Sequence, residues 1–328
     1  MIKKIFVTGG GGYVGSSLVD KLVEKNYSVT VLDLFIYGDN VFKYPEKVKI
    51  IKGDIRDINI LKKSIPGHDA LIHLACISND PSFELNPILG KSINLDAFTP
   101  LIKISKDSGI KKFLYASSSS VYGIKKEQEV TEKMKLQPLT DYSKYKAMCE
   151  DICHKYNSRN FKTIILRPAT VCGFSNRQRF DLVVNILTNF GFNNRSLTVF
   201  GGTQLRPNIH INDMVRSYIT SLENENLLSD MEPIYNIGLE NYSTLDLAGM
   251  VKKNLGQDIN IKIEETNDQR SYHICSTKFS SAAKFKYLFT IDDAIKDLQL
   301  AFQNKKFSEP LSNKLYFNLK MMNSINLS

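Results

Sequence analysis

The feature that most constrains the fold is a glycine-rich turn, TGGGGYVG, at residues 8–15. It follows the apolar run at residues 5–7, which is typical of a strand buried on both faces of a parallel sheet. The segment after it places apolar residues at helical spacing, from Val14 to Val23. A strand, a glycine turn and a helix in this order predict the first unit of an α/β fold.

Three glycines of the turn, Gly9, Gly12 and Gly15, stand three residues apart. The first permits a tight turn, the second lets a pyrophosphate approach the backbone, and the third lets the helix pack on the strand. The helix N-terminus then offers free N–H groups to phosphates. A bare glycine pattern fits any strand–helix turn, but Asp33 ends the next predicted strand, where a carboxylate accepts hydrogen bonds from ribose hydroxyls. We therefore predict dinucleotide binding, and because no Arg directly follows Asp33 to accept a 2′-phosphate, NAD is favoured over NADP.

Strand and helix patterns alternate as far as residue 173. Apolar runs predict further strands at residues 28–33, 48–52, 69–76, 112–116 and 161–173, and helices at about 90–108 and 139–157. The turn-rich residues 78–87 predict a loop over the cofactor. Six strands separated by helices indicate a Rossmann-type, doubly wound parallel sheet, whose ligands bind at the carboxyl ends of the strands.

Beyond residue 173 the alternation stops and shorter elements follow. We predict an NAD-binding domain at residues 1–172, to which about 206–238 return, and a smaller α/β substrate-binding domain at about 173–205 and 239–310. Residues 311–328 are rich in Asn, Lys and Ser, which predicts a tail that packs loosely or frays.

The formal net charge of +9 raises the question of nucleic-acid binding. Part of it comes from residues 303–328, which hold four Lys and one Glu. No basic block with interleaved aromatic residues is present, so scattered solvated lysines are the better interpretation and no nucleic-acid partner is predicted.

The other compositional signals predict a cytoplasmic protein. No apolar run reaches the ~18 residues of a membrane span, and the first residues lead directly into a strand rather than a secretory signal. The five cysteines form no CxxC pair, which indicates a reducing compartment. Cys149 and Cys153 share a helix face without a His or acidic partner, so we predict no metal site.

Tyr142 and Lys146 form a YxxxK pattern on a predicted helix, and a separation of four residues puts both side chains on one face. Free tyrosine has a pKa of about 10 and is a poor base at neutral pH, but a neighbouring cation favours the phenolate. Such pairs also arise by chance on solvated helices. The serine run at residues 117–120, which ends a predicted strand, adds a hydroxyl that could share a substrate hydrogen bond.

Taken in order, these motifs resemble the extended short-chain dehydrogenase/reductase family, and within it the NAD-dependent epimerase/dehydratase branch that acts on nucleotide sugars. The resemblance runs from Lys3 to about Lys278 and rests on TGGGGYVG, Asp33, GDIRD, IHLAC, YASSSSVYG, YSKYK and LRPATVCG.

The resemblance implies a catalytic trio. Ser118 lies four residues before Tyr122, the tyrosine of VYG, and would orient the substrate hydroxyl. Tyr142 would be the base, and Lys146 would hold the cofactor ribose and tune Tyr142. The residues expected to bind the cofactor are Gly9, Gly12, Tyr13, Val14, Gly15, Asp33, Asp54, Ile55, Leu74, Ala75, Asn94, Tyr142 and Lys146.

The resemblance also assigns substrate contacts. Arg206, in RPNIH, would grip the sugar-nucleotide diphosphate, and Arg270 would form a second clamp, since paired guanidinium groups suit phosphate geometry. Either Arg could instead be a surface ion-pair partner. Arg177 and Arg179, in SNRQR, would line the sugar pocket. The expected substrate-binding residues are Ser118, Thr170, Arg177, Arg179, Arg206 and Arg270.

One departure from the family pattern narrows the expected chemistry. Dehydratases of the family carry Asp and Glu directly after the catalytic Ser or Thr, whereas this chain has Ser119 and Ser120. Oxidation at carbon 4 of a nucleotide-diphosphate sugar is therefore expected, either by a 4-epimerase or by a stand-alone 4-dehydrogenase. The runs around residues 78–87 and 167–185 resemble enzymes of bacterial surface-polysaccharide synthesis, including those that handle GDP-heptoses.

The alternatives are a dehydratase, a non-catalytic cofactor-sensing protein and, on charge alone, an RNA-binding relative. Intact Ser118, Tyr142 and Lys146 argue against a sensor, because a sensor needs no proton acceptor. The resemblance further implies a homodimer formed through the helices near residues 90–108 and 142–157.

Overall fold

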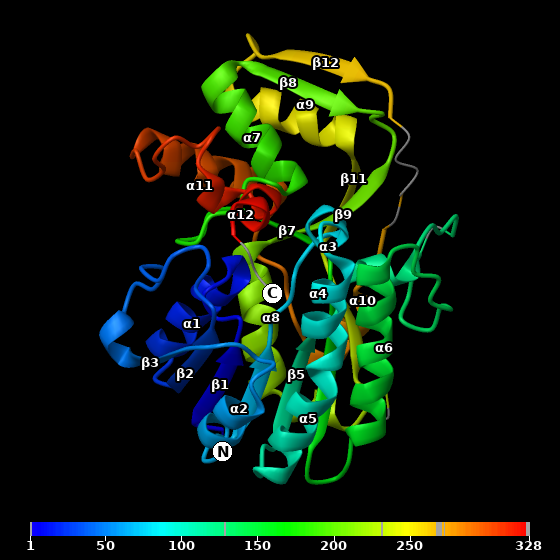
Figure 1. Cartoon of the computed structure of the whole chain (residues 1–328). Helices are drawn as coiled ribbons and strands as arrows, with labels where there is room; N and C mark the ends of the chain where they lie inside the picture. Colours follow the sequence, from blue (N-terminus) through cyan, green and yellow to red (C-terminus); the bar gives the residue numbers. More distant parts are fainter. Residues whose placement is uncertain (1, 128, 231, 267–270, 272, 326–328) are drawn as a thin grey trace.

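The computed structural model of the chain describes residues 2–127, 129–230, 232–266, 271 and 273–325. Its centre is a seven-stranded parallel sheet in the order β10-β6-β5-β4-β1-β2-β3 (Figure 1). The strands are β1 (Lys4–Thr8), β2 (Ser28–Asp33), β3 (Val48–Lys52), β4 (Ala70–His73), β5 (Lys112–Ala116), β6 (Lys162–Pro168) and β10 (Ile234–Ile237). This arrangement confirms the predicted doubly wound parallel sheet.

The register brings the carboxyl ends of the strands to one edge of the sheet. Thr8 at the end of β1 is paired with Leu32 of β2 on one side and His73 of β4 on the other. The chain order reverses between β1 and β4, which is the switch point where doubly wound sheets bind ligands. His73 is 3% exposed and its Nδ1 lies 2.7 Å from Thr8 Oγ1, so it is a packed core residue.

Helices cover both faces of the sheet. The helices α1 (Tyr13–Glu24), α8 (Ile211–Glu223) and α10 (Thr277–Ala283) pack in one apolar cluster with the sheet, and α2 (Ile58–Ser64), α5 (Phe98–Asp107) and α6 (Asp141–Tyr156) pack in another. Short 3-10 turns lie in the connections of this part of the chain: η1 (Pro45–Lys47), η3 (Ser119–Tyr122) and η4 (Glu225–Leu228).

Three segments differ from the sequence predictions. The predicted strand at 161–173 divides, because β7 (Thr170–Cys172) pairs with β9 (Leu205–His210) in a separate sheet. The predicted helix at 90–108 is divided into α4 (Pro87–Lys91), a π-helical turn η2 (Ser92–Asp96) and α5. The predicted loop at 78–87 contains a short helix, α3 (Asp80–Glu84), because the Asn79 side chain caps it and a proline fits its first turn.

A second layer lies above the carboxyl edge of the main sheet (Figure 1). It contains the sheet β11-β9-β7, the strand pair β12-β8 and three helices around an apolar cluster. Its remaining elements are α7 (Val183–Asn194), β8 (Ser196–Phe200), β11 (Glu240–Ser243), α9 (Thr244–Leu255), β12 (Asn260–Glu264) and α11 (Ile291–Gln303).

The segment predicted to be a loose tail is ordered over its described part. It forms η5 (Lys314–Tyr316) and α12 (Asn318–Ser324). Phe317 and Tyr316 join an aromatic cluster around Phe180, and Asn318 is 3% exposed. The expectation of fraying was wrong because Tyr316 and Phe317 pack against aromatic residues that lie far away in the sequence. The polar composition of the segment itself gives no sign of these contacts.

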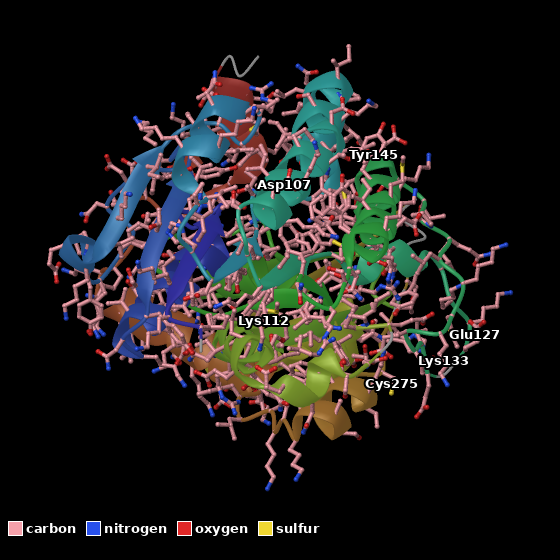
Figure 2. The ribbon with its side chains drawn as sticks, turned by 90° about the horizontal axis from the view of Figure 1, so that it is seen from below. Asp107, Lys112, Glu127, Lys133, Tyr145 and Cys275 are labelled. Carbon is pink, nitrogen blue, oxygen red and sulfur yellow. The ribbon has the colours of Figure 1, made fainter. Side chains whose placement is uncertain are left out.

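Figure 2 shows the opposite, amino-terminal edge of the sheet. There Lys112, at the start of β5, is buried and its Nζ donates hydrogen bonds to the Leu222 carbonyl at 2.7 Å and to Glu225 at 2.8 Å. The loop that carries Glu127 and Lys133 projects from the body of the molecule (Figure 2). No helix among the described residues is both long and apolar enough to cross a lipid bilayer.

Candidate active site

A cavity of about 380 Å³ lies at the carboxyl edge of the main sheet. Its walls come from the glycine turn, the ends of β2, β4 and β5, helix α6, the segment after β7, and α12. It collects most of the predicted site residues: Gly9, Gly12, Tyr13, Val14, Gly15, Asp33, Asp54, Ile55, Leu74, Ala75, Ser118, Tyr142, Lys146, Thr170, Arg177 and Arg179.

The glycine turn has the close packing that a dinucleotide site needs. Gly9 has φ +74°, and a Cβ there would lie 2.4 Å from the Ala75 backbone nitrogen. A Cβ at Gly15 would lie 2.4 Å from the Gly9 carbonyl oxygen. Gly12 caps α1 with no side-chain hydrogen bond, and the first turn of the helix carries no acidic residue. The N-terminus of α1 therefore presents backbone N–H groups to the cavity and fits a pyrophosphate.

Asp33 lies beside this turn at the end of β2. Its two carboxylate oxygens accept hydrogen bonds from the backbone N–H groups of Gly11 at 2.9 Å and Phe35 at 2.7 Å. Burial raises the pKa of this carboxyl, although both hydrogen bonds favour its ionised form. Each oxygen keeps a further lone pair, so the side chain is able to accept ribose hydroxyls. Asp54, on the next strand end, is held by Arg56 at 2.7 Å.

The end of β5 and the first turns of α6 bring Ser118, Tyr142 and Lys146 to the same cavity. Lys146 is 5% exposed. Its Nζ donates to the Ala116 carbonyl at 2.6 Å and lies 5.8 Å from the centre of the Tyr142 ring. The helical spacing predicted from the sequence therefore places an ammonium group beside the phenol ring. A positive charge in such a position favours the ionised form of a phenol.

A chain of hydroxyl groups orients Ser118. Ser143 Oγ donates to Ser120 Oγ at 3.1 Å, and Ser120 Oγ lies 2.9 Å from Ser118 Oγ. Ser118 Oγ also accepts the Ser120 backbone N–H at 3.1 Å. Ser118 Oγ is therefore held by the Ser120 backbone N–H and by a hydroxyl contact with the Ser120 side chain, beside the cavity. The N-terminus of α6 is joined to α3, since its capping residue Thr140 donates to the Asp80 carboxylate at 2.6 Å.

A buried network of polar side chains holds the serine run at residues 117–120 in place. Ser117 donates a short hydrogen bond to Glu150, which also accepts from Arg167 at 3.0 and 2.6 Å. Arg167 in turn donates to the Tyr122 hydroxyl at 2.7 Å, and Tyr122 donates to Asn236 at 2.7 Å. Burial disfavours the charge on Arg167, but Glu150 more than offsets this effect and the pKa of the guanidinium is raised.

Arg177 and Arg179 line the cavity from the segment after β7. The Arg177 guanidinium lies over the Tyr37 ring, 3.6 Å from its centre, and burial lowers its pKa to about 10, so it remains charged at neutral pH. Arg179 Nε is paired with Asp181 at 2.6 Å. Burial disfavours the Arg179 charge, yet this carboxylate raises the pKa of the guanidinium.

Two of the predicted residues, Asn94 and Arg206, are not among the described residues that line the cavity. Asn94 is buried behind it, and its side chain bonds the backbone N–H and carbonyl of Ile77 at 2.9 Å each. Arg206 lies half-buried on β9, where it donates to the Leu205 carbonyl at 3.0 Å. Arg270 lies outside the described residues.

The cavity also has lining residues that the sequence analysis did not single out, among them Tyr37, Ser78, Asp80, Asn318 and Met322. The Asn-Asp-Pro run was a usable signal for Asp80, since it starts a helix. Among the described residues, no group of three or more His, Cys, Asp and Glu side chains is placed to hold a metal ion.

Comparison with known proteins agrees with this geometry. Residues 5–238 match the model of the NAD dependent epimerase/dehydratase family. The chain belongs to this family. Its cofactor is accordingly NAD, which the glycine turn and Asp33 fit.

Individual members of the family cover most of the chain. It is 29% identical to the UDP-glucose 4-epimerase of Lactobacillus helveticus over 275 residues, which span 78% of this chain and 83% of that protein. Among solved structures, the UDP-glucose 4-epimerase of Thermotoga maritima superimposes with a TM-score of 0.83 at 22% identity, over 92% of this chain and 99% of that one. The UDP-N-acetylglucosamine 4-epimerase of Methanobrevibacter ruminantium M1 gives 0.82 at 25% identity, over 91% and 99%.

Proposed function

We propose that the protein is an NAD-dependent 4-epimerase of a nucleotide-diphosphate sugar. The observation that carries this proposal is the convergence of Ser118, Tyr142 and Lys146 on the cavity that also contains the glycine turn. Ser119 and Ser120 follow Ser118, so the carboxylates that a dehydratase uses are missing at these positions. UDP-sugars are the first substrates to test, because the similar proteins above are named for them, and GDP-sugars such as GDP-heptoses are the second.

In the proposed mechanism, Tyr142 accepts the proton of the substrate hydroxyl at carbon 4. The Lys146 ammonium, held against Ala116, stabilises the phenolate that makes this transfer possible. The Ser118 hydroxyl would hydrogen-bond the same substrate oxygen and fix its position. Bound NAD supplies the group that takes up a hydride from carbon 4 and returns it. Return to the opposite face of the sugar would give the epimer.

We further infer how the chain divides into domains, how it assembles and where it acts. The main sheet with its flanking helices would be the NAD-binding domain, and the second layer would be the substrate-binding domain. Met148 on α6 is 46% exposed, which supports the expected homodimer through the helices near residues 90–108 and 142–157. The described cysteines are all unpaired, which supports a location in the reducing cytoplasm. The proposed role in bacterial surface-polysaccharide synthesis rests on the resemblance of the runs around residues 78–87 and 167–185.

The test compares Tyr142→Phe with Tyr145→Phe on the same helix. Tyr145, labelled on α6 in Figure 2, is half-buried against Phe83. It is not one of the described residues that line the cavity. Tyr142→Phe should bind NAD and UDP normally but slow sugar oxidation by about 10²–10⁴-fold, as for loss of a general base. Tyr145→Phe should keep full activity. Single-turnover NADH absorbance gives the rate, and NMR of the sugar product identifies the reaction.

The two forms of the chemistry give different outcomes in the same assay. An epimerase shows a small or transient NADH signal while the inverted sugar accumulates. A stable 4-keto sugar with stoichiometric NADH would instead identify a stand-alone dehydrogenase. Full activity in Tyr142→Phe would refute the proposed mechanism.

A further inference from the structure

The C-terminal helix α12 forms part of the cavity wall through Asn318 and Met322. Asn318 joins two segments that are distant in sequence. Its Oδ1 accepts from Arg177 Nη2 at 2.7 Å, and its Nδ2 donates to Ser78 Oγ, after β4, at 2.9 Å. Its backbone N–H donates to Asp181 at 3.0 Å. Asn318 therefore joins α12 to the segment after β4 and to the segment after β7 through hydrogen bonds.

The two arginines beside Asn318 have unused donors. Arg177 Nε and Arg179 Nη2 are buried and have no hydrogen-bond partner among the described residues. Arg177 and Arg179 are 4% and 8% exposed. Asp181 compensates the charge of Arg179 at 2.6 Å, whereas Arg177 is bonded to the neutral Asn318. Buried N–H donors of a charged group require an acceptor, so the pair fits an anionic ligand that enters the cavity.

The position of Arg177 favours the cofactor half of the cavity. Ser175, two residues before Arg177, donates to the Tyr13 carbonyl at 2.8 Å and lies 2.8 Å from Ser16 Oγ. The segment is therefore packed on the first turn of α1, where the glycine turn accommodates a pyrophosphate. Arg177 also stacks on Tyr37, shortly after the ribose-binding position Asp33.

We propose that Arg177 and Arg179 bind the diphosphate of NAD, and that Asn318 is a positioning residue that holds Arg177 and closes this side of the cofactor cleft. Bound cofactor then leaves slowly. This inference deepens the proposed function, because an epimerase reuses its cofactor in every turnover while a dehydrogenase must exchange it. The diphosphate of the sugar nucleotide offers the same chemistry, and the experiment separates the two sources.

The experiment measures release of NADH from the full-length protein, by its fluorescence after displacement with excess NAD, together with UDP affinity by calorimetry. Asn318→Ala should speed release about tenfold or more, as for loss of a hydrogen bond to a charged group. Asn323→Ala, an exposed asparagine on the same helix, is the matched control and should leave release unchanged. Arg177→Gln should speed release at least as much and leave UDP affinity within about twofold of the wild type.

A double variant distinguishes positioning from a general loosening of α12. If Asn318 acts through Arg177, the variant with both substitutions should release NADH no faster than Arg177→Gln alone. Additive effects would overturn the positioning role. Unchanged release in Asn318→Ala, or weaker UDP binding with unchanged NADH release in Arg177→Gln, would overturn the assignment to the cofactor. If Arg177→Gln does not fold, Asn318→Ala and its control still decide the proposal. Inactivity with every sugar nucleotide would refute the proposed function without affecting these release rates.

Discussion

Glu150→Gln should destabilise the folded protein strongly, because it leaves a buried guanidinium without its counter-charge. Glu150 and Arg167 have side chains that are each 3% exposed and are joined by two hydrogen bonds, at 3.0 and 2.6 Å. Glutamine keeps the shape of the side chain but removes the negative charge. Breaking one partner of such a pair costs about 3–5 kcal/mol. This loss is a large part of the roughly 5–15 kcal/mol by which a folded protein is stable.

Urea denaturation followed by circular dichroism measures this loss of unfolding free energy. The matched control is Asp141→Asn on the same helix, since the Asp141–Lys144 pair is 3.0 Å long but its side chains are 49% and 51% exposed. Water screens that pair, so the control should lose less than about 1 kcal/mol.

Replacing both partners by apolar residues tests what the network does for the site. The double variant Glu150→Leu with Arg167→Met should recover most of the lost stability, because no unpaired charge remains. It should still turn over slowly, since Ser117 loses its acceptor and the segment that carries Ser118 loses its support. A single variant within about 1 kcal/mol of the wild type would refute the energetic reasoning. Full turnover in the double variant would refute the supporting role.

Three further predictions concern the cofactor, the substrate and pH. Asp33→Ala should lose at least about tenfold of the preference for NADH over NADPH in fluorescence titrations, because the carboxylate that repels a 2′-phosphate is gone; a parent protein that binds NADPH equally well would contradict this. Arg206→Ala should raise the KM for the nucleotide sugar and leave NAD affinity unchanged, and an unchanged KM would locate the diphosphate clamp elsewhere. Burial lowers the pKa of His73 to about 3, whereas the unfolded chain takes up the proton near pH 6.5, so stability should fall with falling pH below that value by about 1.4 kcal/mol per pH unit. His73→Asn should reduce this slope between pH 6.5 and 5 in urea denaturation, while His68, whose pKa burial also lowers, keeps its own contribution.

The parts of the fold that local patterns specify were predictable from the sequence. The strand, glycine turn and helix around Gly12 are contiguous in the chain, and the helical spacing of Tyr142 and Lys146 places both on one face. The segment 206–238 was expected to return to the NAD-binding domain, but β10 was not predicted as a strand of the main sheet, because a four-residue strand reveals its partner only through the register with β6. The division of the strand at 161–173 likewise depends on the pairing of β7 with β9.

The parts of the site that depend on long-range contacts were not predictable. Asn318 and Ser78 are 240 residues apart in the chain, and nothing in the local composition indicates their hydrogen bond. The supporting role of Glu150 has the same origin, because its partners Ser117 and Arg167 lie on different strands or strand ends. No local sequence pattern distinguishes Asn318 from the other asparagines of this polar segment.

The outer strand of the main sheet, β3, shows how an open sheet edge can be protected against pairing with another strand. Among the described residues it is hydrogen-bonded to β2 on one side only, and Ile50 on it is 42% exposed. Lys49 and Lys52 stand exposed beside the apolar positions. A second strand that approached this edge would have to bury or oppose their ammonium groups, which disfavours edge-to-edge aggregation. Part of the net positive charge therefore lies on this open edge, where it disfavours pairing with another chain.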